Sequence, residues 1–75
     1  MEDFNQFISK KRAELSFIFK TVKSEGALQE KFLLIQTIYE ELFDAKQMYT
    51  EQAQVELINE HLRIIRDFCL ENLLH

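Results

Sequence analysis

The chain has no proline and no tryptophan, and Gly26 is its only glycine. Proline and glycine are the residues that most often end helices and form turns. A chain that nearly lacks both has few local signals that would interrupt a regular element. Its apolar residues instead recur at helical spacing in three stretches. The sequence therefore predicts a small, all-helical protein with a sharp turn at Gly26.

Cysteine is also scarce, and long apolar runs are absent. Cys69 is the only cysteine among 75 residues, so an internal disulfide is excluded. A single thiol is typical of a reducing compartment, and we expect a cytoplasmic protein. The longest uninterrupted apolar run, Phe32 to Ile35, has four residues, whereas a membrane span needs ~18. The first residues lack the basic and apolar segments of a signal peptide, and we expect no membrane partner.

Apolar residues are nonetheless abundant for so short a chain. They make up 47% of the sequence and include seven phenylalanines. We expect one domain over residues 1–75, and a core of this size rarely supplies more than ~3–5 kcal/mol of stability. A three-helix monomer of this length cannot easily cover all seven rings. The surplus predicts a homodimer, or a protein partner that is bound at all times.

Three helices are expected, over residues 2–24, 28–46 and 51–74. Lys11 interrupts the apolar spine of the first helix, and Gly26 follows that helix as its C-terminal cap. Thr50 is expected to cap the third helix, with Glu51 in its first turn. The second helix has the broadest apolar stripe, which indicates a central helix with more than one neighbour. This stripe runs through Leu28, Phe32, Ile35, Tyr39 and Leu42, and is widened by Leu34, Ile38, Phe43 and Ala45.

The boundary between the second and third helices carries no glycine or proline. One continuous helix from Leu28 to Leu74 is therefore the alternative. The apolar stripe of the third segment is rotated by roughly 140° from that of the second. A straight helix would expose one stripe, whereas a turn near Lys46 to Thr50 lets both face one core. We expect the turn, and hence an all-α three-helix bundle that forms a homodimeric helical bundle.

No group of residues predicts catalysis or metal binding. A carboxylate-bridged metal site in a bundle uses Glu-x-x-His, but Ile58 stands where His61 would need the glutamate. His61 precedes Cys69 by eight residues, or roughly 12 Å along a helix, which is too far for a base and its nucleophile. We expect His61 to be a solvated residue at the edge of the stripe and Cys69 to be a structural thiol. We expect no enzymatic activity and no cofactor.

The charges are unevenly distributed along the chain. Residues 1–24 carry five bases and three acids, a balance of +2, and residues 25–75 carry four bases and ten acids, a balance of −6. Opposite patches on two molecules can steer their association. The same asymmetry can also serve solubility alone.

Six residues are candidates for an interface. Phe17 and Leu33 lie off the apolar stripes of their helices, and each is either a contact anchor or ordinary surface. Lys11 lies on the apolar spine, where it either extends its ammonium to solvent or meets an acidic group of another chain. The remaining three form an acidic group that is either a solvated ridge or a patch for a basic partner surface: Glu40, Glu41 and Asp44.

These features favour a small non-enzymatic protein–protein interaction module. Such a module is a regulator, inhibitor or assembly chaperone that binds another protein through an exposed apolar helical face. The alternative is a structural subunit of a larger helical assembly. Nucleic-acid binding is the least favoured class, because the net charge is −4 and the basic run from Lys10 to Arg12 is short.

Overall fold

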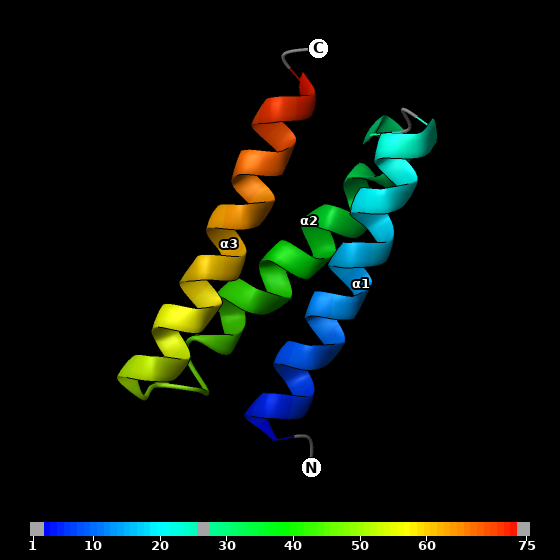
Figure 1. Cartoon of the computed structure of the whole chain (residues 1–75). Helices are drawn as coiled ribbons and strands as arrows, with labels where there is room; N and C mark the ends of the chain where they lie inside the picture. Colours follow the sequence, from blue (N-terminus) through cyan, green and yellow to red (C-terminus); the bar gives the residue numbers. More distant parts are fainter. Residues whose placement is uncertain (1–2, 26–27, 74–75) are drawn as a thin grey trace.

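The computed structural model describes residues 3–25 and 28–73, which form three α-helices. They are α1 (Phe4–Glu25), α2 (Leu28–Ala45) and α3 (Gln52–Leu73). In Figure 1, α1 and α3 run in the same direction, and α2 runs back between them on the far side. The predicted all-α three-helix fold is confirmed. The cap predicted at Gly26, the first two residues and the last two residues lie outside the described residues.

The start of α1 is fixed by a reciprocal pair of hydrogen bonds. The backbone N–H of Gln6 donates to the Asp3 carboxylate over 2.8 Å, and the backbone N–H of Asp3 donates to the Gln6 side-chain oxygen over 3.2 Å. This capping box satisfies N–H groups that have no partner within the helix. Asp3 falls within the helix predicted to begin at residue 2, but it occupies the cap position, and α1 begins at Phe4.

The predicted break between α2 and α3 is confirmed. Residues 46–48 form a tight turn in which the N–H of Met48 donates to the Ala45 carbonyl over 3.0 Å. The ring of Tyr49 then lies 5.1 Å from that of Phe4 and 5.7 Å from that of Phe7, both on α1. Packing against another helix therefore accompanies a turn that glycine and proline do not mark.

The start of α3 lies one residue later than predicted. The Glu51 carbonyl accepts a hydrogen bond from Val55 over 2.9 Å, and the Glu51 N–H donates to the Gln54 side chain over 3.3 Å. Glu51 therefore occupies the cap position expected for Thr50, and the helix begins at Gln52.

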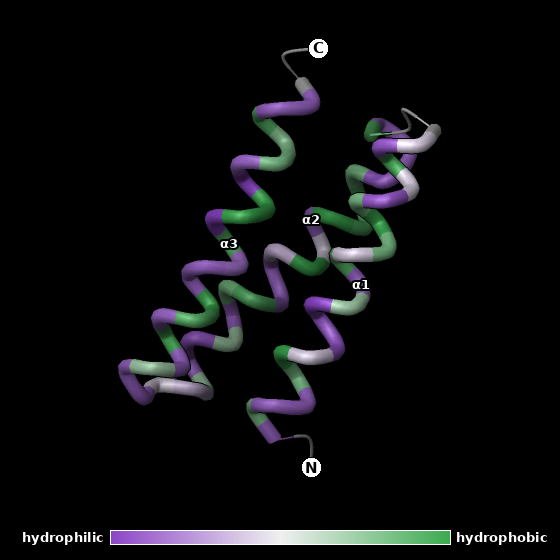
Figure 2. The backbone as a smooth tube through the Cα atoms, in the orientation of Figure 1, coloured by the Kyte–Doolittle hydropathy of each residue, from purple (hydrophilic) through white to green (hydrophobic). Residues whose placement is uncertain are grey.

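Apolar side chains from all three helices meet in one core. Figure 2 shows hydrophobic residues recurring along each helix, as an amphipathic pattern requires. The rings of Phe19 on α1 and Phe68 on α3 stack with their centroids 4.0 Å apart. The buried apolar residues are Ile8, Leu15, Ile18, Val22, Ile35, Ile38, Leu42, Ala45, Ile58, Leu62, Ile65 and Phe68.

The second helix is central, as predicted, but only part of its apolar stripe is covered. It packs against both α1 and α3, and both neighbours lie on the same side of it (Figure 1). Ile35 and Ile38 are buried, whereas Phe32 and Tyr39, which were expected on the buried stripe, are exposed. The predicted centre of the buried face of α2 is therefore wrong, because the apolar arc of this helix is wider than the surface that α1 and α3 cover.

Candidate interaction surfaces

Lys11 is buried and forms an ion pair that joins α1 to a half-exposed carboxylate of α2. Its ammonium lies 2.7 Å from a Glu41 oxygen and 3.2 Å from a Glu14 oxygen, and it sits 5.6 Å from the centre of the Phe7 ring. The Lys11 side chain is 5% exposed, while that of Glu41 is 45% exposed. Lys11 thus meets an acidic group of its own chain, which neither of the two expectations for this residue had named.

Two opposing effects act on the pKa of Lys11. Burial disfavours the charged ammonium and lowers the pKa, while the hydrogen bonds and negative charges of Glu41 and Glu14 raise it. The carboxylates prevail, and the pKa lies above its ordinary value of 10.5. Lys11 is therefore charged at neutral pH, and it cross-links the two helices.

The side of α2 that faces away from the other helices is rich in apolar side chains. We call this surface the α2 outer face. Leu33 is 75% exposed, and Phe32 and Phe43 are each about half exposed. Glu40 and Asp44 lie on the same surface and form no ion pair with any described residue. The α2 outer face consists of Phe32, Leu33, Gln36, Glu40, Phe43 and Asp44.

Phe17 lies on α1, beside the α2 outer face. It is 69% exposed, and it lines a hollow between α1 and α2 together with Leu34 and Thr37. The floor of this hollow is formed by the core residues Ile18 and Ile38. Phe17 and the apolar part of α2 therefore belong to neighbouring surfaces.

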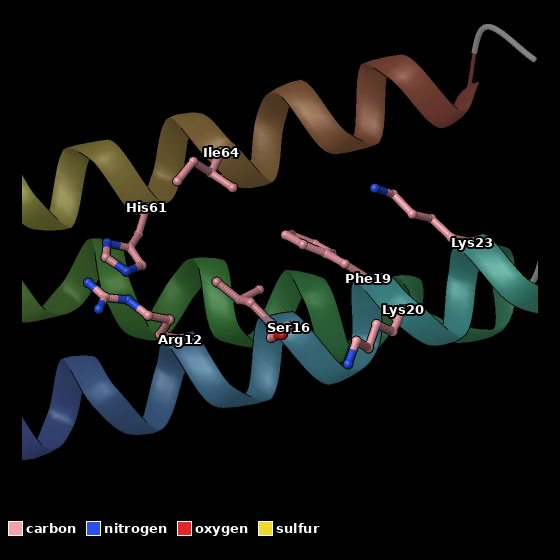
Figure 3. Close-up of a pocket in the computed structure, with 8 residues that line it drawn as sticks. Arg12, Ser16, Phe19, Lys20, Lys23, His61 and Ile64 are labelled. Carbon is pink, nitrogen blue, oxygen red and sulfur yellow. The ribbon is translucent and has the colours of Figure 1, made fainter.

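A second concave surface, the α1–α3 groove, lies between the two parallel helices. Arg12, Lys20 and Lys23 extend from α1 along this groove, and all three are exposed (Figure 3). The ion pairs within residues 3–25 and 28–73 include none of these three bases. The groove has a volume of about 400 Å³, and its lining consists of Arg12, Leu15, Ser16, Phe19, Lys20, Lys23, His61 and Ile64.

His61 is buried at one end of the groove, which corrects the expectation of a solvated edge residue. It is 5% exposed, and its Nδ1 lies 2.8 Å from the Leu57 carbonyl oxygen. Since a carbonyl only accepts, Nδ1 carries the proton that it donates. Figure 3 shows the His61 ring directed into the groove, beside the guanidinium of Arg12. The histidine is accommodated because its polar atoms have a backbone carbonyl on one side and the groove on the other.

Cys69 is half-buried against the core, as a structural thiol would be. Burial disfavours the thiolate and raises the pKa of the Cys69 thiol above its ordinary value of 9.0. The thiol is therefore protonated at neutral pH, and a protonated thiol is a poor nucleophile.

The interface candidates predicted from the sequence include exposed residues of α2, but they include no residue that lines the α1–α3 groove. Arg12, Lys20 and Lys23 could have been recognised as one group, because they share a flank of α1 on a wheel of 100° per residue. No sequence pattern indicates that α3 forms the other wall of the groove, since this depends on how α1 and α3 pack together.

Comparison with known proteins gives no match: no protein-family model, no curated protein and no solved structure is similar to this chain. Within residues 3–25 and 28–73, no helix is both long and apolar enough to cross a membrane. The same residues contain no group of three or more His, Cys, Asp or Glu side chains placed to hold a metal ion.

Proposed function

We propose that the protein is a small non-enzymatic interaction module that binds other protein chains through the α2 outer face. The observation that carries this proposal is the exposure of apolar side chains on a single helix. Nine large hydrophobic residues are exposed among the described residues, and five of them are on α2. An apolar surface gathered in one place is typical of a protein–protein interface.

The arrangement of the helices supports the same proposal. Both neighbours of α2 lie on one side, so the opposite side has no helix of this chain to cover it (Figure 1). Covering apolar area contributes about 25 cal/mol per Å², and large apolar and aromatic residues carry much of the binding energy of an interface. Self-association into a homodimer, or capture of a different protein, would use this free energy. The single thiol of Cys69 supports a cytoplasmic setting.

The variant Phe17→Ser/Leu33→Ser tests the proposal. Both side chains are highly exposed, so we expect the helical content to stay unchanged in circular dichroism. We expect self-association, or the capture of a partner, to weaken at least tenfold. The variant removes one apolar side chain on the α2 outer face, Leu33, and one beside it, Phe17. Sedimentation equilibrium at micromolar concentration measures the first effect, and affinity capture measures the second.

The matched control is Met48→Ser/Leu70→Ser, which removes two other exposed apolar side chains that lie outside the α2 outer face. We expect this control to associate like the unmodified protein. Equal effects of the two double variants would contradict a specific role for the α2 outer face. Lost helicity in Phe17→Ser/Leu33→Ser would show that these residues stabilise the fold.

A structural subunit of a larger helical assembly is the second candidate. The observation that favours it is that acidic side chains and bases occupy separate surfaces of one chain, on the α2 outer face and in the α1–α3 groove. Affinity capture distinguishes the two candidates. A different protein bound at a fixed ratio supports the interaction module, whereas copies of this chain alone support the structural subunit.

A further inference from the structure

The α1–α3 groove combines an apolar floor with bases that form no ion pair within the described part of the chain. Lys20 and Lys23 are three residues apart, and Arg12 lies eight residues before Lys20. On a helix these separations correspond to roughly 4.5 Å and 12 Å along the axis. Phe19 and Ile64 form the apolar floor between the two helices. The groove is therefore suited to an elongated partner with apolar residues along its centre and acidic groups near both ends.

The α2 helix carries the complementary pattern on its exposed side. Glu40 and Asp44 are four residues apart, and Glu30, which is also exposed, lies ten residues before Glu40. The separations are roughly 6 Å and 15 Å along the axis. Leu33 and Phe43 lie within this acidic span and are exposed. The α2 outer face, taken together with Glu30 before its N-terminal end, is thus apolar with acids near both ends, and these acids match the bases of the groove in sign and approximate spacing.

We propose that the α2 outer face of one copy docks into the α1–α3 groove of a second copy. This inference rests on the proposed use of the α2 outer face as a binding surface, and it corresponds to the second candidate, the structural subunit, because the partner is another copy of this chain. Phe43 or Leu33 would cover Phe19 and Ile64, and the acids of α2 would face the bases of α1. Opposite charges accelerate the encounter and fix its register, while the apolar contact holds the complex together.

The two docking surfaces differ and lie on opposite sides of the molecule. The α2 outer face lies on the side of α2 away from α1 and α3 (Figure 1), whereas the residues that line the groove lie between α1 and α3, in front of α2 (Figure 3). A contact between unlike surfaces leaves one of each unoccupied in a pair. Further copies can therefore add at both ends, and the average mass rises with concentration instead of stopping at a dimer.

Single charge reversals with matched controls test the contact. Lys20→Glu changes the groove, and Lys10→Glu makes the same change at an exposed position of α1 outside the groove lining. Glu40→Lys changes the α2 outer face, and Glu56→Lys is its control on an exposed part of α3. We expect each docking-surface variant to associate at least about fivefold more weakly, because attraction becomes repulsion. The two controls should associate within twofold of the unmodified protein.

A mixing experiment distinguishes unlike surfaces from like ones. Lys20→Glu/Lys23→Glu has a defective groove, and Glu40→Lys/Asp44→Lys has a defective α2 outer face. Each is expected to be monomeric alone in sedimentation velocity. A mixture retains one intact groove and one intact α2 outer face, and the two reversed surfaces also attract each other. We expect complexes in the mixture, beginning at twice the 9.0 kDa of one chain.

The outcomes separate this inference from the proposed function. If Lys20→Glu and Lys10→Glu weaken self-association equally, the inference alone is overturned, because the contact then does not depend on the groove. The inference is also overturned if the mixture forms no complexes while both variants are folded by circular dichroism. A chain that remains monomeric at all concentrations and captures no partner overturns both proposals.

Discussion

The ion pair of Lys11 allows a test in which two ways of removing one contact give opposite results. In Glu41→Gln the ammonium of Lys11 stays buried and loses its closer carboxylate, at 2.7 Å, while Glu14 remains at 3.2 Å. In Lys11→Met the charge disappears and a side chain of similar volume fills the same place. We expect Glu41→Gln to destabilise the fold and Lys11→Met to be nearly neutral.

The magnitude follows from the burial of the pair. Removing one partner of a fully buried pair costs about 3–5 kcal/mol, whereas exposed pairs contribute about 0–1 kcal/mol. Lys11 is buried but both carboxylates are more than 40% exposed, and one acid remains in the variant. We therefore expect Glu41→Gln to lower the free energy of unfolding by about 1–2 kcal/mol. For a domain of this size each 1 kcal/mol lowers the melting temperature by roughly 4–8 °C.

Thermal and urea unfolding of a double-mutant cycle measure these values. Glu41→Gln should cost at most about 0.5 kcal/mol when Lys11 is already methionine, because the buried charge is gone. Glu56→Gln is the control on an exposed helix position, and it should change stability by at most about 0.5 kcal/mol. If Glu41→Gln costs the same in both backgrounds, or if Lys11→Met is the more harmful change, the reasoning about the buried ammonium is wrong.

Three further changes test the core and its titratable groups. Ile35→Asp should abolish cooperative unfolding, because Ile35 is 2% exposed and an unpaired core charge costs several kcal/mol, whereas Gln36→Asp on the exposed side should melt like the unmodified protein. Folding raises the pKa of Lys11. The stability that the charged ammonium contributes is therefore complete below pH 10.5 and declines as the pH rises through the higher pKa of the folded state. Urea titrations between pH 9 and 12 should show this decline in the unmodified protein and not in Lys11→Met. Burial raises the pKa of Cys69, so iodoacetamide at pH 8 should modify the folded chain at least tenfold more slowly than the urea-unfolded chain, and equal rates would contradict a protonated, half-buried thiol.

The periodicity of the sequence is sufficient for the three helices but not for the exact face that each one buries. On α2 the apolar arc covers about half of the circumference, and the neighbours cover only the part around Ile38 and Leu42. Helical phase cannot distinguish the covered part from the exposed part, because both are equally apolar. The position of the contact is set by the turn after α2 and by the packing of α1.

Polar residues in the core were predicted less well than apolar ones. Lys11 could be recognised as unusual from its place on the spine, but Glu41 is thirty residues away in the chain and no spacing rule connects them. His61 was expected in solvent because it lies about 80° from the centre of the apolar stripe of its helix, on a wheel of 100° per residue. Its hydrogen bond to the Leu57 carbonyl and its access to the α1–α3 groove remove the cost of burial, and both depend on tertiary structure.

The turn after α2 bears on which parts of the chain are needed to form the bend between α2 and α3. Glycine and proline are absent there, and the ring of Tyr49 packs against Phe4 and Phe7 of α1 just after the turn. A fragment of residues 28–73 lacks these two rings and keeps the strong helical tendency on both sides of residues 46–51. We therefore expect the docking of α1 to stabilise the turn that the packing of α3 on α2 already favours, and we expect a peptide spanning only the turn not to adopt this conformation.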